Sequence, residues 1–162
     1  MYRKLNLANH ERGILTAGHE LSVFDLYTTE GAVPVGVQIC RELRFPEQWL
    51  WLARQGAQFF LHLNNAVGAG RFLPVWRSHL VARAAETQRY VLSANAADAD
   101  QTSPTLAVDP QGFILAEVVS DEQKVLRVEL DLERISNLYL EQSRDDLLHN
   151  SQRPRSPKRF NR

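Results

Sequence analysis

The sequence predicts a layered α/β domain in which a sheet is covered by helices on one face. Two observations lead to this prediction. Segments with strand-like and helix-like apolar patterns alternate along the first part of the chain, and a run of strand-like segments follows them. The chain has 162 residues, of which 44% are hydrophobic, so we expect one domain with a core of ordinary size.

The first part of the chain is predicted to hold three strands and two helices. Residues 1–20 are polar and are interrupted by glycines, so we expect a loop there. A helix is predicted from Pro46, which suits the first helical position, to Gly56, which ends it. A longer helix is predicted over 73–88, because Leu73, Trp76, Leu80, Ala84 and Thr87 repeat at helical spacing. The predicted strands cover 21–26, 32–39 and 57–63.

The second part of the chain is predicted to consist mainly of strands. A hairpin is expected around the turn Asp109-Pro-Gln-Gly112, and residues 132–142 are expected to form a final helix. The predicted strands cover 90–94, 105–108, 113–119 and 124–130. Residues 1–150 are therefore interpreted as the domain, and residues 151–162, which contain two prolines and five basic residues, as an extended basic tail.

Charge and composition exclude several classes of protein. The whole chain is neutral, and its first 150 residues carry 14 basic and 19 acidic side chains, so a nucleic-acid partner is not expected. No apolar run reaches the roughly 18–20 residues that a membrane span needs, and no signal-peptide pattern is seen. We therefore expect a cytoplasmic protein without a membrane partner. One cysteine and five dispersed histidines indicate neither a disulfide framework nor a metal site.

Cys40 is the first candidate for chemistry, because it ends an apolar strand and precedes a loop and a helix. Open α/β sheets tend to place reactive groups just beyond the carboxyl ends of their strands. A buried structural thiol is the more common fate of a lone cysteine. A catalytic thiol would also need a nearby cation or base and hydrogen-bond donors for an oxyanion.

Five segments, in order along the chain, resemble the nitrilase superfamily of carbon–nitrogen hydrolases. The strongest is Cys40-Arg-Glu-Leu-Arg-Phe-Pro-Glu47, which is similar to the nucleophile segment of that family. The upstream segment with Lys4, Glu11 and Gly18 resembles the catalytic-lysine segment. The others are Trp76 with Ala82–Gln88, Asn95, and Thr105 through Asp109-Pro-Gln-Gly112.

The resemblance implies part of an α-β-β-α sandwich and a cysteine hydrolase without a cofactor or metal. Cys40 would be the nucleophile, Lys4 the cation facing the oxyanion, and the backbone N–H of Arg41 a second oxyanion donor. Glu11 matches a supporting glutamate near the lysine. The implied substrate is a small-molecule amide or nitrile, cleaved through a thioester on the cysteine.

The chain departs from the family pattern at its start and at two other positions. Only three residues precede Lys4, so the general-base glutamate of the family has no counterpart, and the domain is expected to be N-terminally incomplete. Glu42 replaces a frequent aspartate, and Thr87 replaces an asparagine. We expect the chain to form a homo-oligomer or to bind a complementing N-terminal chain. Without such a partner we expect it to be poorly soluble. The alternative is a non-catalytic remnant or partner-binding subunit.

Two further side chains are given structural roles at this stage. Arg83 and Glu86 are spaced i, i+3 on the long predicted helix, so an intrahelical ion pair is expected. His62 lies in an apolar strand and could approach the reactive site, but a satisfied histidine in the core is the preferred interpretation.

Overall fold

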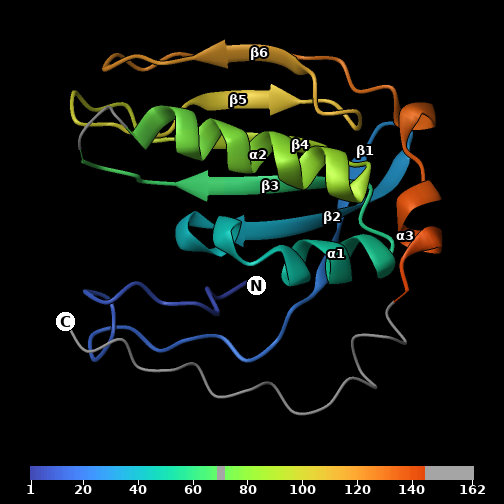
Figure 1. Ribbon diagram of the computed structural model, residues 1–162, viewed down its shortest axis with the longest axis horizontal. Coiled ribbons are helices and arrows are strands. Elements are labelled where there is room, and N and C mark those ends of the chain that lie inside the picture. The colour runs from blue at the N-terminus through green and yellow to red at the C-terminus, as the bar shows by residue number, and fades with distance from the viewer. Residues whose placement is uncertain (69–71, 145–162) are drawn as a thin grey trace.

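The computed structural model describes residues 1–68 and 72–144, and it contains one six-stranded sheet with helices on one face (Figure 1). The strands are β1 (Val23–Thr28), β2 (Gly31–Ile39), β3 (Phe59–Asn64), β4 (Tyr90–Asn95), β5 (Thr105–Val108) and β6 (Ile114–Val118). The helices are α1 (Pro46–Arg54), α2 (Leu73–Thr87) and α3 (Leu138–Gln142), with short 3-10 turns at Cys40–Arg44 and Leu132–Arg134. The predicted α/β class is therefore confirmed.

The strands follow one another across the sheet in the order β1-β2-β3-β4-β5-β6. The pairs β2–β3 and β3–β4 are parallel, and the other pairs are antiparallel. Their register aligns Ile39 with Leu63 and Leu63 with Ala94, so the carboxyl ends of β2, β3 and β4 meet at one edge of the sheet. This is the edge at which α/β proteins commonly place their ligands.

The main core lies between this sheet and the helices α1 and α2. Phe60 and Val91 face the helices, which contribute Trp49, Leu52 and Leu80, all fully buried. The neighbouring position on β2 is Gly36, at which a Cβ atom would lie 2.7 Å from the Phe60 ring. A glycine therefore lets α1 and Phe60 pack closely over β2.

The opposite face of the sheet is only partly covered. Near one end, Val35, Phe59 and Tyr90 are buried and contact Leu130 and Ile135 from the C-terminal part of the chain. Toward the carboxyl ends of the strands, an open apolar hollow of about 450 Å³ remains, and Leu63 beside it is 53% exposed. Its floor is formed by Val37, Leu61, Leu63, Leu92, Ala94 and Ala107. Among the residues that the structure describes, no second sheet covers this face as one would in a sandwich.

The strand predicted over 124–130 is wrong. These residues form no strand; Lys124, Val125, Leu126 and Val128 line the open hollow, while Leu130 packs beside Tyr90. Alternation of apolar side chains reflects this contact with an apolar sheet face and does not require a paired strand. Val125 is 83% exposed, which shows how loosely the segment covers the sheet.

The helix predicted over 132–142 is also wrong in its extent, since only the 3-10 turn Leu132–Arg134 and α3 form. Ile135 between them is extended, with ψ at 138°. Arg89 binds the Ser136 carbonyl and the Asn137 side chain, at 2.5 Å each, and Arg134 binds Asp109 at 2.6 Å. These contacts with distant residues hold the backbone around Ile135 in a non-helical conformation, at the point where the predicted helix would have continued.

The other predicted elements are found with boundaries shifted by a few residues. Residues 1–20 contain no helix or strand, as expected. The basic tail over 151–162 lies outside the residues that the structure describes. Among the helices within the described ranges, none is long and apolar enough to cross a membrane.

Candidate active site

Cys40 lies at a sharp bend where β2 ends and the 3-10 turn Cys40–Arg44 begins; we call these five residues the Cys40 turn. Its φ angle of +51° is in the left-handed region, which residues other than glycine rarely adopt. Such a conformation costs about 1–3 kcal/mol and persists only where surrounding contacts enforce it. The Cys40 side chain is partly accessible to solvent.

Three buried side chains from three different elements hold the carbonyl groups of the Cys40 turn. His62 Nε2 on β3 lies 3.1 Å from the Cys40 oxygen. Trp49 Nε1 on α1 donates to the Glu42 oxygen at 3.0 Å, and Arg83 Nε on α2 donates to the Leu43 oxygen at 3.0 Å. These contacts fix the orientation of three peptide groups in the Cys40 turn, and such fixed orientation is a general requirement of backbone oxyanion donors.

Glu42 joins this turn to the chain that carries Lys4. Its carboxylate is fully buried and accepts hydrogen bonds from the Leu5 and Asn6 amides at 2.6 and 3.2 Å. It also accepts from the Tyr2 hydroxyl at 2.8 Å and the Ile39 amide at 2.7 Å. Burial and the neighbouring Glu42 carboxylate raise the pKa of the Tyr2 phenol, so Tyr2 stays a donor.

The Lys4 ammonium is nearly buried and is paired with Glu11. Lys4 Nζ lies 2.8 and 2.7 Å from the two Glu11 carboxylate oxygens, and the Ala8 amide donates to the same carboxylate at 2.6 Å. The hydrogen bond from Lys4, followed by that from Ala8, holds the pKa of Glu11 below its ordinary value. The structure thus brings together the lysine and the supporting glutamate that the resemblance implied.

Gly18 fixes the backbone on which Lys4 lies. The Gly18 amide donates to the Lys4 carbonyl at 2.9 Å. A Cβ atom at this position would lie 2.3 Å from the Arg3 carbonyl oxygen. No side chain fits there without moving the Lys4 backbone, which gives a physical reason for the glycine in this segment.

His62 is a satisfied core residue, in agreement with the preferred interpretation. Because the Cys40 oxygen can only accept, Nε2 carries the proton, and Nδ1 accepts from the Ser93 hydroxyl at 2.9 Å. Burial lowers the pKa of His62 to about 4, so the ring is neutral at physiological pH. It therefore orients the Cys40 backbone and does not serve as a charged partner of the thiol.

The low pKa of His62 predicts a loss of stability in acid. As the pH falls, the histidine of the unfolded chain, with a pKa near 6.5, binds a proton at a higher pH than His62 of the folded chain does. Proton binding therefore favours the unfolded chain below pH 6.5, and the folded chain keeps the full contribution of neutral His62 only above that pH. This contribution, on the order of 3 kcal/mol, is lost as the pH falls from 6.5 to 4. Urea unfolding at both pH values should show a smaller acid loss for His62→Gln than for the wild type. His19→Gln, at an exposed site, should keep the wild-type loss.

Sequence reasoning found some of these contacts and missed others. The predicted Arg83–Glu86 ion pair is present, but the bond from Arg83 to the Cys40 turn was not expected. The roles of Glu42 and Trp49 were also missed. The Glu42 partners in the Lys4 segment lie 36 to 40 residues away in the sequence, so no local spacing could reveal them.

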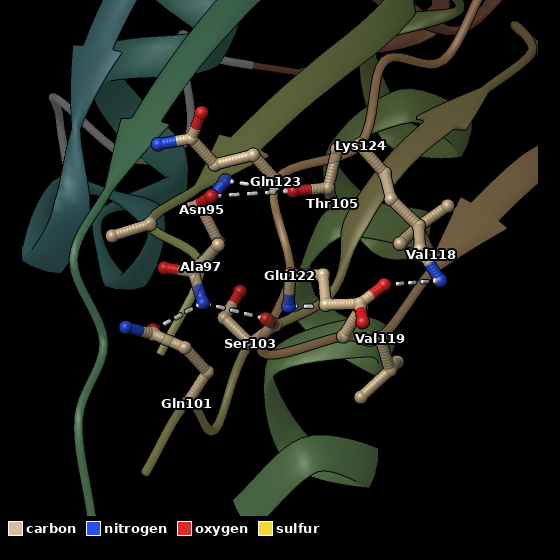
Figure 2. Close-up of a pocket in the computed structure, with 12 residues that line it drawn as sticks. Asn95, Ala97, Gln101, Ser103, Thr105, Val118, Val119, Glu122, Gln123 and Lys124 are labelled. Carbon is tan, nitrogen blue, oxygen red and sulfur yellow. Dashed lines mark hydrogen bonds and ion pairs between the residues drawn. The ribbon is translucent and has the colours of Figure 1, made fainter. Parts of the chain in front are cut away.

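A separate polar pocket of about 150 Å³ lies between the ends of β4 and β6 (Figure 2). Asn95 Nδ2 donates to the Ser103 carbonyl at 2.7 Å, and the Asn95 amide donates to Thr105 Oγ1 at 3.0 Å. Neither Cys40 nor Lys4 lines this pocket, so it is distinct from the candidate thiol site.

Most of the chain matches a known protein family. Residues 1–139 match the model of the carbon–nitrogen hydrolase family. This chain belongs to the carbon–nitrogen hydrolase family. It is 33% identical over 141 residues to an (R)-stereoselective amidase of a Pseudomonas species, a match that covers 83% of this chain and 48% of the amidase.

Solved carbon–nitrogen hydrolase structures share the fold. A nitrilase-superfamily protein of Saccharomyces cerevisiae is 28% identical, with a TM-score of 0.67, over 94% of this chain and 54% of that chain. An amidase of Nesterenkonia sp. AN1, solved with the acetamide moiety of fluoroacetamide on its active site cysteine, is 25% identical. Its TM-score is 0.74, over 92% of this chain and 55% of that chain. The present chain spans about half the length of its relatives.

Proposed function

We propose that this carbon–nitrogen hydrolase chain carries the cysteine and lysine of an enzyme that hydrolyses small linear amides or related nitriles. Cys40 is the nucleophile, and Lys4 and the Arg41 backbone N–H stabilise the oxyanion. The observation that supports this most is the Glu42 carboxylate, which hydrogen-bonds both the Lys4 segment and the residue before Cys40. The amidases among the relatives favour an amide as the substrate class.

The proposed reaction uses a covalent thioester. The Cys40 sulfur attacks the amide carbon, and the carbonyl electrons move to an oxyanion that faces the Lys4 ammonium. The C–N bond then breaks, and the leaving nitrogen takes up the proton that a general base removed from the thiol. Water adds to the thioester with help from the same base, which releases the acid and restores the thiol.

We further propose that the base comes from a complementing N-terminal segment that covers the open sheet face. The chain spans about half the length of its relatives, and the apolar floor of the hollow, with Leu63 half exposed, is a surface of the kind that a second sheet buries. Glu11 is committed to Lys4 through two short contacts, which leaves the role of base to another carboxylate. A second copy of this chain on the same face is the alternative occupant.

The reactivity of the thiol tests the proposed pairing of Cys40 with Lys4. Since Cys40 is the one cysteine of the chain, the uptake of iodoacetamide reports on it alone. An adjacent ammonium stabilises the thiolate, so the folded chain at pH 6 should react roughly five-fold or more faster than the urea-unfolded chain. Lys4→Gln should remove most of this excess, whereas Lys124→Gln, at an exposed site, should keep it.

The opposite result would favour the second candidate function. If the folded thiol reacts more slowly than the unfolded one and Lys4→Gln changes nothing, Cys40 is a structural thiol. The chain would then be a binding subunit that uses its open apolar sheet face, the feature that most favours that alternative.

A further inference from the structure

The Glu42 carboxylate is fully buried, and the other buried acid among the described residues, Asp109, is paired with Arg134. Within residues 1–68 and 72–144 no cation pairs with Glu42, and its carboxylate accepts four hydrogen bonds, from Tyr2, the Leu5 and Asn6 amides, and Ile39. Burying a carboxylate is costly unless donors of this kind surround it. An apolar residue in its place would leave the three backbone amides without an acceptor, so the carboxylate ties together the segments that carry those amides.

The partners of the two carboxylate oxygens define that role. Oε1 accepts from the amides of Leu5 and Asn6, which directly follow Lys4. Oε2 accepts from the Ile39 amide, which directly precedes Cys40, and from the Tyr2 hydroxyl on the other side of Lys4. One carboxylate thus contacts residues on both sides of the lysine and the residue directly before the thiol.

We propose that Glu42 is a positioning residue that holds the Lys4 ammonium beside the Cys40 thiol. It does not touch the reacting atoms and acts through Lys4, while its hydrogen bond from the Ile39 amide ties the lysine segment to the end of β2. This inference rests on the proposed function, which assigns the thiol and the ammonium their chemical roles. The contact of Lys4 with Glu11 sets the direction of the ammonium within its loop, and Glu42 sets where that loop lies relative to Cys40.

Two physical effects of removing the Glu42 charge have opposite signs at the thiol. A negative carboxylate near a thiol disfavours the thiolate, so Glu42→Gln should by charge alone make Cys40 more reactive. If Glu42 positions Lys4, the same change releases the lysine and makes Cys40 less reactive. The sign of the change in reactivity therefore separates the two roles.

The test measures iodoacetamide uptake at pH 6 on the full chain for the wild type, Lys4→Gln, Glu42→Gln and the double variant. We expect Glu42→Gln to lose most of the rate excess of the folded wild type, about as much as Lys4→Gln does. The double variant should be no slower than Lys4→Gln alone, because both changes remove the same interaction. Glu42→Asp, which keeps the charge, should recover part of the rate. Thermal unfolding checks that each variant is folded.

Three outcomes would overturn the proposal. Glu42→Gln could react as fast as the wild type or faster, or its effect could add to that of Lys4→Gln. In the third, hydrogen exchange at the Leu5 and Asn6 amides would be no faster in Glu42→Gln than in the wild type. Hydrogen exchange does not depend on the thiol, so it tests whether Glu42 holds the Lys4 segment even if the wild-type thiol proves unreactive. An unreactive wild-type thiol would count against the proposed function and not against this role of Glu42.

Discussion

Replacing Cys40 with alanine is expected to lower amide hydrolysis by at least about 10³-fold, or about 4 kcal/mol of transition-state stabilisation. The substitution removes the sulfur that would form the thioester, and the chain has no second cysteine to replace it. The measurement is the release of ammonia from a short aliphatic amide, with the complementing segment present. Mass spectrometry of the intact chain should show an acyl adduct in the wild type and none in the variant.

The fold of Cys40→Ala should stay intact, because the hydrogen bonds of the Cys40 turn use its backbone and the side chains of other residues. Its thermal unfolding should therefore stay close to that of the wild type. Turnover that survives in a folded Cys40→Ala variant would show that the nucleophile is assigned to the wrong residue.

Replacing Trp49 with alanine is expected to lower the free energy of unfolding by roughly 3–5 kcal/mol. Trp49 is fully buried and packs edge-on against Phe60, with ring centroids 4.9 Å apart. Its indole N–H also donates to the Glu42 carbonyl, so alanine would leave a cavity and remove one of the two hydrogen bonds to that carbonyl, the other coming from the Phe45 amide. Urea unfolding followed by fluorescence or circular dichroism measures the loss.

Trp51 offers a matched control on the same helix. It is 42% exposed, and Trp51→Ala should cost less than about 1 kcal/mol. Equal losses for Trp49→Ala and Trp51→Ala would mean that α1 does not pack against the sheet through Trp49. A loss confined to Trp49 would support the packing that holds the Cys40 turn.

The sequence predicts those elements best whose pattern and end signals agree. For α1, Pro46 occupies the first turn and Gly56 follows the end with a φ of +93°, as expected. For residues 124–130, alternation indicates contact with an apolar surface but not a paired strand. The break before α3 depends on Arg89, which lies 47 residues before Ser136, and no local pattern reports such a contact.

The sequence suggested which residues form the candidate site but not how the site is built. The order of Lys4, Glu11 and Cys40 along the chain suggested the site through a family resemblance. Their arrangement depends on Glu42, Trp49, His62 and Arg83, which reach the site from distant parts of the sequence. Such hydrogen bonds follow from tertiary packing, and single-sequence periodicity carries no information about them.

The left-handed backbone conformation of Cys40 affects which substitutions this position can accept during evolution. Glycine adopts that conformation without steric cost, and asparagine does so more readily than most residues. Either substitution would therefore relax the native backbone, while both would remove the sulfur. Under the proposed function, position 40 therefore exchanges stability for activity, and a chain freed from selection for catalysis could drift there toward glycine or asparagine.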